Sequence, residues 1–342
     1  MFVLDDGRRL VIPRTELTYP CHLMKLHENA AKAPVDHVMA DFEDACPYEF
    51  KGPRSREVMI EALKTIDFGS RVVVIRPNNI RSKFFRGDLE AVMLGAPNRF
   101  HGIILPKTNE PEDVIHLDRL LTSLEEEGGW TAPVKIEALI ETPLAVENAF
   151  RIATASDRMA GLIFGIADFA SAMGVSEMVI DQNHNFHYAK QRTVVAAKAA
   201  GLHAIDNAYL TLVRRDTSPE DRDRIESGLR DKVEGSAALG MDGTWVIHPQ
   251  QAEISNAAFT PDEAQIEEAQ HVLTWYHEQG GGALFDPVYG KFHDEATIKG
   301  LLMQLAKGVQ GGAVEPAFLE DMARKSEEVS GYDILDMMKR VA

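Results

Sequence analysis

The 342-residue sequence predicts an α/β fold, a (β/α)8 TIM barrel followed by a C-terminal helical appendage. Three observations support this prediction. Eight short apolar segments alternate with helix-like segments, the alternation runs over about 250 residues as barrels of this kind usually do, and it stops near residue 255. We therefore expect a barrel domain over residues 1–255 and a helical extension over 256–342.

The eight strand candidates are short and rich in β-branched and other apolar residues. In chain order they are LTYP (17–20), HVMADFED (37–44), RVVVIRPN (71–78), HGIILPK (101–107), VKIEALIET (134–142), GLIFGIAD (161–168), LHAIDNA (202–208) and GTWVIHP (243–249). Several are continuously apolar, which is typical of parallel strands that are covered on both faces. A doubly wound sheet is the alternative, but no GxGxxG motif follows the first strand to support it.

Helix-like segments separate these strands, among them SREVMIEALKTI, PEDVIHLDRLLTSLEEE, PLAVENAFRIATA and YAKQRTVVAAKAAG. After residue 255 the pattern changes to two helical segments, TPDEAQIEEAQHVLTWYHEQ and EATIKGLLMQLAKG, joined by GGGALFDPVYGKFHD. The joining segment contains glycine and proline turn signals, so we expect a loop there and no further strand.

Composition and charge restrict the function classes. The formal net charge of −17 argues against a nucleic-acid-binding surface. The N-terminus lacks the pattern of a signal peptide, and no apolar run reaches the roughly 18 residues of a membrane-spanning helix. The two cysteines, Cys21 and Cys46, have neither CxxC spacing nor the pattern of a disulfide framework. We therefore expect a cytoplasmic protein with small-molecule partners.

Polar side chains gather at the C-terminal ends of the predicted strands, where active sites of such barrels lie. They are Glu43, Asp44, Arg76, Lys107, Glu141, Asp168, Asp206 and His248. Any one of them has an ordinary explanation, because strand ends also meet solvent. Glu141 and Asp168 together are more informative, because they top neighbouring strands about 5 Å apart.

Two close carboxylates repel each other unless they share a proton or a cation. With oxygen ligands only, the cation expected at Glu141 and Asp168 is Mg²⁺, with Mn²⁺ as the alternative. Arg76 stands before a proline at the end of a strand, where it could hold a carboxylate or stabilise an oxyanion. A structural ion pair with Glu43 or Asp44 is the other interpretation of Arg76, and both roles are compatible.

Several longer segments occur together in one order. They are DFEDACP, VVIRPN, GIILPKTN, ALIETPLAVEN, GLIFGIADFASAMG, ALGMDGTWVIHPQQ and GKFHDEATIK, and they span roughly residues 35–305. In this order they resemble the citrate lyase β-subunit/malyl-CoA lyase group of the HpcH/HpaI aldolase superfamily. The segments IET…GIADFA and GTWVIHPQQ are the most specific of them.

This resemblance implies a Mg²⁺-dependent, reversible carbon–carbon lyase. Its substrate would be a 3-hydroxyacyl-CoA thioester of the malyl-CoA or citramalyl-CoA type, and its products an acetyl-CoA-like enolate and a 2-oxo acid, glyoxylate or pyruvate. By motif position, Glu141 and Asp168 would be the metal ligands, and Arg76 would face the thioester oxygen. Glu43 and Asp44 match the acidic pair that supports this arginine and the water-held metal.

The resemblance also assigns a role to the C-terminal extension. Asp294 in GKFHDEATIK matches the aspartate that family members bring over the barrel mouth of a neighbouring subunit as an acid/base. This implies a homo-oligomer, a trimer or a hexamer, in which the extension serves as a lid. Taken alone, Asp294 predicts an N-cap for the helix that begins at Glu295. Lys107 is expected to form a salt bridge at the rim, and His248 to make structural hydrogen bonds.

One departure concerns coenzyme A. After the first strand the family usually has a PGS(N/R)P turn that contacts the CoA phosphates and adenine, whereas this chain has TYPCHLMK at 18–25. Glycine amides approach phosphates most closely, so Lys25, His22, Arg81 or Lys83 would have to replace that contact. His184 and His187 suggest a metal site, but a polar loop is the preferred interpretation.

Three alternatives to the lyase follow from these residues. The altered turn favours a CoA-independent 2-oxo-acid aldolase of the same superfamily. Net thioester hydrolysis would give an outcome like that of malate synthase. A non-catalytic barrel subunit is a different class, and the presence of Glu141, Asp168, Arg76 and Asp294 together argues against it.

Overall fold

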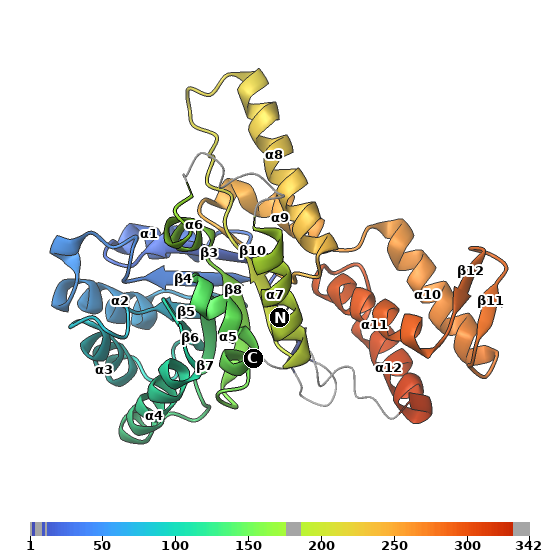
Figure 1. Cartoon of the computed structure of the whole chain (residues 1–342), viewed down its shortest axis with the longest axis horizontal. Coiled ribbons are helices and arrows are strands. Elements are labelled where there is room, and N and C mark those ends of the chain that lie inside the picture. The colour runs from blue at the N-terminus through green and yellow to red at the C-terminus, as the bar shows by residue number, and fades with distance from the viewer. Residues whose placement is uncertain (1, 4–8, 11, 176–185, 331–342) are drawn as a thin grey trace. The chain divides into compact units, whose positions relative to one another are not determined.

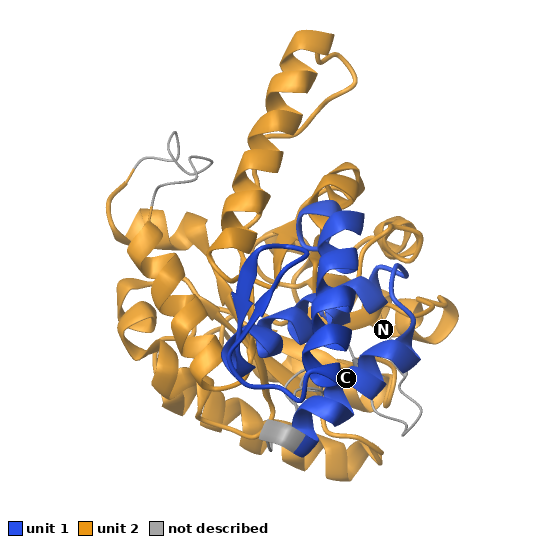
Figure 2. Cartoon of the chain, turned by 90° about the vertical axis from the view of Figure 1, so that its right-hand side faces the viewer, with its two compact units in different colours: residues 1–12, 257–340, 342 blue, residues 13–256, 341 orange. Residues whose placement is uncertain are grey.

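The computed structural model describes residues 2–3, 9–10, 12–175 and 186–330 (Figure 1). They form two compact units, drawn in orange and blue in Figure 2: residues 13–256, and the described parts of 1–12 and 257–340. The beginning of the chain thus groups with the C-terminal unit, whereas the sequence placed it with the barrel. The Ile12 amide donates to Gln310 Oε1 at 2.6 Å, and Gln310 Nε2 donates back to the Ile12 carbonyl at 2.5 Å.

The predicted eight-stranded barrel is confirmed. Eight parallel strands close in the order β10-β3-β4-β5-β6-β7-β8-β9. They are β3 (Thr15–Pro20), β4 (His37–Asp41), β5 (Val72–Arg76), β6 (Gly102–Leu105), β7 (Lys135–Ile140), β8 (Met159–Phe164), β9 (His203–Asp206) and β10 (Gly243–Val246). Every residue of β4, β5, β6, β8, β9 and β10 is buried, which explains the continuously apolar sequences of β6 and β8.

Helices follow the strands and surround them (Figure 1). They are α1 (Met24–Ala30), α2 (Pro53–Thr65), α3 (Phe85–Gly95), α4 (Pro111–Gly128), α5 (Pro143–Ala153), α6 (Ile166–Ala172), α7 (His187–Ala199), α8 (Pro219–Ala238) and α9 (Ala252–Ala258). No helix in the described part of the chain is long and apolar enough to cross a membrane. Local signals explain their starts: Thr142 Oγ1 accepts from the Ala145 amide, so α5 begins directly after Glu141.

The register of the barrel brings particular strand ends together. Asp41 of β4 pairs with Arg76 of β5, and Ile140 of β7 pairs with Phe164 of β8. Because the strands are parallel, the residues that follow them lie at one rim. The strands end earlier than predicted, at Asp41 and Phe164 instead of at Asp44 and Asp168.

The C-terminal unit has its own hydrophobic core. Its helices are α10 (Glu263–Glu278), α11 (Glu295–Gln310) and α12 (Pro316–Ser330), and they bury Leu273, Tyr276, Leu302, Leu305 and Leu319 among others. The expectation of no further strand is wrong, because β11 (Leu284–Asp286) and β12 (Lys291–His293) form an antiparallel hairpin. Each strand has only three residues, too few for an alternating pattern to be recognised. A second small pair joins β1 (Phe2–Val3) to β2 (Arg9–Leu10).

Candidate active site

A cavity of about 260 Å³ lies at the C-terminal ends of the barrel strands. Its lining combines charged side chains with apolar ones, namely Thr18, Asp44, Ala45, Arg76, Glu141, Phe164, Gly165, Ile166, Ala167, Asp168, Asn207, Ala208, Trp245 and Ile247. Four of the residues singled out at the strand ends, Asp44, Arg76, Glu141 and Asp168, therefore meet in one cavity. A pocket with few converging polar groups and apolar walls is the usual form of a small-molecule site.

Arg76 is held by a carboxylate that was not singled out from the sequence. Its Nε and Nη2 atoms donate to the two oxygens of Asp41 at 2.8 and 2.5 Å, and both side chains are buried. Burial alone would lower the pKa of Arg76, but the charge and hydrogen bonds of Asp41 raise it above its usual value. The same pairing lowers the pKa of Asp41 against the effect of its burial. Arg76 is thus a permanently charged, fixed guanidinium.

The indole of Trp245 covers this guanidinium, with Arg76 Cζ 5.4 Å from the ring centroid. Glu43 forms an ion pair with Arg76, as one interpretation of this arginine predicted, because its Oε2 lies 3.7 Å from Arg76 Nη1. Asp41 is the closer, bidentate partner, and Asp44 pairs with Lys107. Asp41 was overlooked because the strand was expected to run to Asp44, which placed Asp41 inside it.

Lys107 connects the acidic residues at the rim. Its Nζ lies 2.9 Å from Glu43 Oε1, 3.1 Å from Asp44 Oδ2 and 3.7 Å from Asp168 Oδ1. Burial would lower the pKa of Lys107, but its hydrogen bond to Glu43 and the neighbouring carboxylates raise it. The expected salt bridge of Lys107 is therefore present. Its backbone is left-handed, with φ of 51°, and its amide donates to Glu141 Oε1 at 2.5 Å.

Glu141 is the buried acid of the cavity, with only 2% of its surface exposed. Burial raises its pKa well above the usual value, and the negative charge of Asp168 raises it further. Gly165 makes room for this carboxylate, because a Cβ atom there would lie 2.6 Å from Glu141 Cβ and 2.9 Å from its Oε2. The absence of a side chain at Gly165 therefore permits the position of Glu141.

Asp168 reaches the cavity from a helix. It lies in the first turn of α6, four residues beyond the end of β8, and not at the strand end as predicted. Its side chain is 38% exposed, so it faces solvent where Glu141 does not. One buried and one accessible carboxylate in the same cavity form an oxygen-only donor set that fits Mg²⁺, which binds through one or two carboxylates and keeps places for water and substrate.

Asp294 belongs to the C-terminal unit and caps α11, as its sequence context predicts. Its Oδ1 accepts from the amides of Ala296 and Thr297, both at 3.1 Å, and Thr297 Oγ1 accepts from the Asp294 amide at 3.0 Å. The side chain of Asp294 is exposed. Its carboxylate is thus oriented by the helix, while one oxygen remains available.

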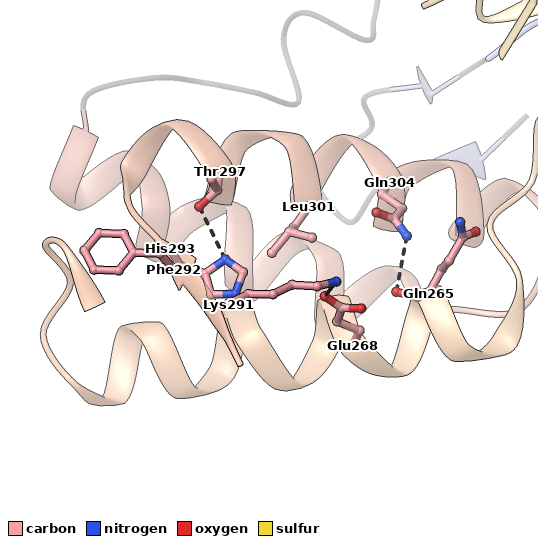
Figure 3. Close-up of a pocket in the computed structure, with 8 residues that line it drawn as sticks. All are labelled: Gln265, Glu268, Lys291, Phe292, His293, Thr297, Leu301 and Gln304. Carbon is pink, nitrogen blue, oxygen red and sulfur yellow. Dashed lines mark hydrogen bonds and ion pairs between the residues drawn. The ribbon is translucent and has the colours of Figure 1, made fainter. Parts of the chain in front are cut away.

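A pocket of about 540 Å³ adjoins this cap within the C-terminal unit (Figure 3). Its walls are Gln265 and Glu268 of α10, Lys291, Phe292 and His293 of β12, and Thr297, Leu301 and Gln304 of α11. Lys291 pairs with Glu268, and Thr297 Oγ1 lies 3.4 Å from His293 Nδ1. These contacts tie the hairpin to both helices, so the segment that carries Asp294 is held on each side.

Of the side chains expected to contact CoA, Lys25, Arg81 and Lys83 are exposed and His22 is half-buried, and none of the four lines the barrel cavity. Lys25 pairs with Glu28 at 3.3 Å, and Arg81 with Asp113 at 3.1 Å. Lys83 lies near two aromatic rings, 5.0 Å from the centroid of Phe84.

The remaining polar residues have local roles. His248 caps a short 3₁₀ helix, Pro249–Gln251, and its Nδ1 accepts from the Gln250 amide at 3.2 Å, as expected for a structural residue. His22 stacks on Phe50, with ring centroids 4.6 Å apart. His187 is the exposed first residue of α7, and His184 lies outside the described residues. Asp206 is buried against Lys190 and Lys232, behind the cavity wall formed by Asn207.

Comparison with known proteins identifies the family of the chain. Residues 16–249 match the family described as HpcH/HpaI aldolase/citrate lyase. The L-malyl-CoA/beta-methylmalyl-CoA lyase of Cereibacter sphaeroides (strain ATCC 17025 / ATH 2.4.3) is 31% identical over 305 residues, 84% of this chain and 91% of that protein.

Solved structures share the fold. A citrate lyase from Burkholderia xenovorans LB400 matches with a TM-score of 0.74 at 20% identity, over 92% of this chain and 97% of that one. The citrate lyase beta subunit of Mycobacterium tuberculosis, solved with oxaloacetate and magnesium, matches with a TM-score of 0.57 at 25% identity, over 73% of this chain and 98% of that one. The predicted resemblance is confirmed, and the chain belongs to the HpcH/HpaI aldolase/citrate lyase family.

Proposed function

We propose that the protein is a Mg²⁺-dependent carbon–carbon lyase that cleaves or forms a 3-hydroxyacyl-CoA thioester of the malyl-CoA or citramalyl-CoA type. The products of cleavage would be acetyl-CoA, formed through its enolate, and the 2-oxo acid glyoxylate or pyruvate. The observation that carries this proposal is the meeting of Glu141, Asp168 and Arg76 in one cavity at the barrel rim. The relative from Cereibacter sphaeroides is named for this type of reaction.

The proposed roles follow from the position of each group. Glu141 and Asp168 would hold Mg²⁺, which supplies Lewis-acid polarisation of the carbonyl oxygen of the 2-oxo acid. Arg76, fixed by Asp41 and covered by Trp245, presents a permanent positive charge to the cavity. A fixed donor of this kind stabilises the oxygen of the thioester enolate, where negative charge develops. Mn²⁺ is the alternative ion for the same donor set.

The size of the cavity suits the reacting end of such a substrate. At about 260 Å³ it falls just below the range of roughly 300–1,000 Å³ usual for sites of drug-sized ligands. It therefore fits a small 2-oxo acid and a thioester group, and a CoA nucleotide would lie outside it. In this proposal Lys25, Arg81 and Lys83 are the side chains available to the nucleotide.

A CoA-independent 2-oxo-acid aldolase is the second candidate. The observation that favours it is that Lys25, Arg81 and Lys83 do not line the cavity. Both candidates use Glu141, Asp168 and Arg76. They differ in whether the substrate that is cleaved is a CoA thioester or a CoA-free acid.

A substrate screen with Mg²⁺ distinguishes the candidates. Malyl-CoA, citramalyl-CoA and CoA-free 4-hydroxy-2-oxo acids would be supplied singly, and released glyoxylate or pyruvate followed with a phenylhydrazine assay. We expect release from the thioesters only, and free CoA thiol to stay at background. Cleavage restricted to CoA-free acids would support the aldolase, CoA release would indicate hydrolysis, and no turnover by folded protein would contradict the proposal.

Calorimetry tests the metal ligands. Glu141→Ala and Asp168→Ala are each expected to abolish Mg²⁺ binding, because each removes one of only two protein ligands. Glu147→Ala on the outer helix α5 is the matched control and should bind Mg²⁺ normally. Unchanged binding in both ligand variants would refute the assignment.

We further propose that the protein works in the cytoplasm as a homotrimer or homohexamer, in which Asp294 serves as acid/base at the barrel of a neighbouring subunit. Two features support this. The segment around Asp294 exposes the apolar side chains Phe285, Val288 and Phe292, and exposed apolar surface marks interaction sites. Cys21 and Cys46 are both free and buried, which suits a reducing compartment.

A further inference from the structure

Three ionisable side chains lie inside the barrel and take no part in the candidate active site. They are Glu16 on β3, His37 on β4 and Glu137 on β7, with 0%, 0% and 2% of their surfaces exposed. Branched apolar side chains dominate the interiors of barrels of this kind. Three buried ionisable groups in this layer therefore require a physical explanation.

Most of their polar atoms have no hydrogen-bond partner among the described residues. These atoms are Glu16 Oε1, both carboxylate oxygens of Glu137 and both ring nitrogens of His37. Buried polar atoms are almost always paired, because leaving them unpaired is costly. A proton shared between Glu16 and Glu137 would join the two carboxyl groups but leave the imidazole unsatisfied.

The three side chains converge on one point. One donor atom of each lies within 4.8 Å of the others, and His37 Nδ1 is 3.7 Å from Glu16 Oε1. Ligand atoms bound to one tetrahedral Zn²⁺ ion by bonds of about 2.2 Å lie about 3.6 Å apart. Closing the cluster around one ion thus requires the separations of its atoms to shrink by at most about 1.2 Å.

The electrostatics of the cluster also favour a cation. Burial raises the pKa of Glu16 to about 7 and that of Glu137 well above its usual value, and the negative charge of Glu16 raises the pKa of Glu137 further. Burial lowers the pKa of His37, so its imidazole is neutral, the form that binds metals. A divalent ion would cancel both carboxylate charges and satisfy one atom of each side chain.

We propose that Glu16, His37 and Glu137 bind a divalent transition-metal ion of the Zn²⁺ or Mn²⁺ class inside the barrel. Carboxylate oxygens with an imidazole nitrogen suit these ions. Trp245 Nε1 donates to Glu16 Oε2, which fixes the orientation of this carboxylate, as hydrogen-bond partners of metal ligands do. Glu137 on β7 precedes Glu141 by four residues, so the two side chains are separated by about 13 Å along the chain direction of this strand. The interior site is therefore a structural site, separate from the one proposed for Mg²⁺.

Metal analysis of the full-length protein tests this proposal. The protein would be purified with Zn²⁺ or Mn²⁺ added singly, treated with EDTA to remove accessible ions, and analysed by mass spectrometry of its metal content. We expect about one retained equivalent, as for buried structural sites, in the unmodified protein and in the Glu141→Ala/Asp168→Ala double variant. His37→Gln and Glu137→Gln should reduce retention at least about 10-fold.

His27→Gln is the matched control. His27 is also fully buried in the barrel unit, but both of its ring nitrogens have partners, Tyr19 Oη and the Cys21 carbonyl. This variant should retain the ion. Retention by His37→Gln and Glu137→Gln equal to that of the control would overturn the proposal, as would the absence of a retained ion in unmodified protein.

Cobalt substitution keeps the test decisive if the cluster variants fail to fold. Co²⁺ bound by one imidazole and two carboxylates in a buried site gives visible d–d absorption that resists EDTA. We expect this spectrum in the Glu141→Ala/Asp168→Ala double variant, where the rim ligands are absent. A spectrum that disappears in this variant would place the ion at the rim and refute the interior site.

Discussion

Among single residues, Asp41 shows how a buried charge depends on its partner. It accepts two hydrogen bonds from Arg76, and both side chains are shielded from water. Removing one member of such a pair leaves the other charge buried without compensation, which costs far more than losing an exposed pair.

We therefore predict that Asp41→Asn lowers the free energy of unfolding by about 3–5 kcal/mol, measured by urea denaturation. Asp44→Asn is the matched control, because Asp44 pairs with Lys107 but its side chain is 54% exposed. Its effect should stay within about 1 kcal/mol. Equal effects of the two substitutions would show that Asp41 does not compensate the buried positive charge of Arg76.

Gly165 allows a prediction about metal affinity. An added Cβ would collide with the backbone end of the Glu141 side chain, which cannot rotate away. Gly165→Ala should therefore weaken Mg²⁺ binding, measured by calorimetry, by about 10- to 100-fold. This is the usual loss when residues that orient a metal ligand are changed. In Gly300→Ala the new Cβ meets no atom within 4 Å, so affinity should not change. Normal affinity in Gly165→Ala would mean that Glu141 is not a ligand in its present position.

Much of this residue-level picture could be predicted from the sequence, because rim acids and Arg76 follow apolar runs that are easy to recognise. Asp41 could not be identified as the partner of Arg76, since that depends on which residues the register of β4 and β5 places side by side. The interior cluster was missed for a related reason. Glu16 and His37 are register partners on the consecutive strands β3 and β4, but Glu137 comes from β7, and only closure of the barrel brings it to them.

At the level of elements, β9 is tied to α7 and α8 by a buried network. Asp206 accepts from Lys190 of α7 at 3.0 Å and lies 3.1 Å from Lys232 Nζ of α8. Burial alone would raise the pKa of Asp206, but the charges of Lys232 and Lys190 lower it below its usual 3.8. The network thus fastens two outer helices to the strand that precedes the cavity wall at Asn207.

The lowered pKa of Asp206 predicts how the free energy of unfolding depends on pH. Because the pKa of Asp206 is lower in the folded state, its contribution to stability is complete above its unfolded pKa and decreases as pH falls through the folded one. Asp206→Asn should lower the free energy of unfolding by about 3–5 kcal/mol near neutral pH, since two buried lysines lose their counter-charge. The difference from unmodified protein should begin to shrink below about pH 4.

Urea titrations between about pH 3 and pH 8 measure this difference. Asp221→Asn, in the exposed first turn of α8, is the control and should have little effect at any pH. A difference between Asp206→Asn and unmodified protein that grows toward acid would contradict the assigned charge state of Asp206.

Helices and strands could be predicted from the sequence where they have a local sequence pattern of their own. Strand and helix order followed from apolar runs and helix patterns. Their ends did not, because β8 stops at Phe164 where the chain turns into α6, and the apolar run continues across that turn. The hairpin of β11 and β12 was missed because each strand is too short to show a period of two.

For the whole molecule, the residues assigned to one reaction belong to two units. Glu141, Asp168 and Arg76 are in the barrel unit, whereas Asp294 is in the C-terminal unit. If sites are shared between subunits, defects in the two units should complement each other. Mixing inactive Asp294→Ala with inactive Asp168→Ala protein should then restore about one quarter of the activity. When equal amounts of the two variants assemble at random, about one site in four combines an intact barrel with an intact neighbouring extension.

Subunit exchange would be verified with two affinity tags before activity is measured. Mixing Asp168→Ala with Glu141→Ala is the matched control, because both defects lie in the same unit and no intact site can form. Recovery in the first mixture alone supports a shared site. An absence of recovery despite demonstrated exchange would show that each chain uses its own Asp294, or none.

Glu137 lies on β7 and Glu141 directly follows this strand, and their spacing has a consequence for the evolution of the protein. Side chains alternate along an extended chain, so residues four apart share a face, and a shift of one residue turns both away together. β7 should therefore accept neither an insertion nor a deletion, and its outward residues Ile136, Ala138 and Ile140 are themselves buried. Length variation should instead collect in the exposed connection at 131–133, just before the strand begins. A library of single-residue insertions across 129–142, selected for folded protein, would map this boundary directly.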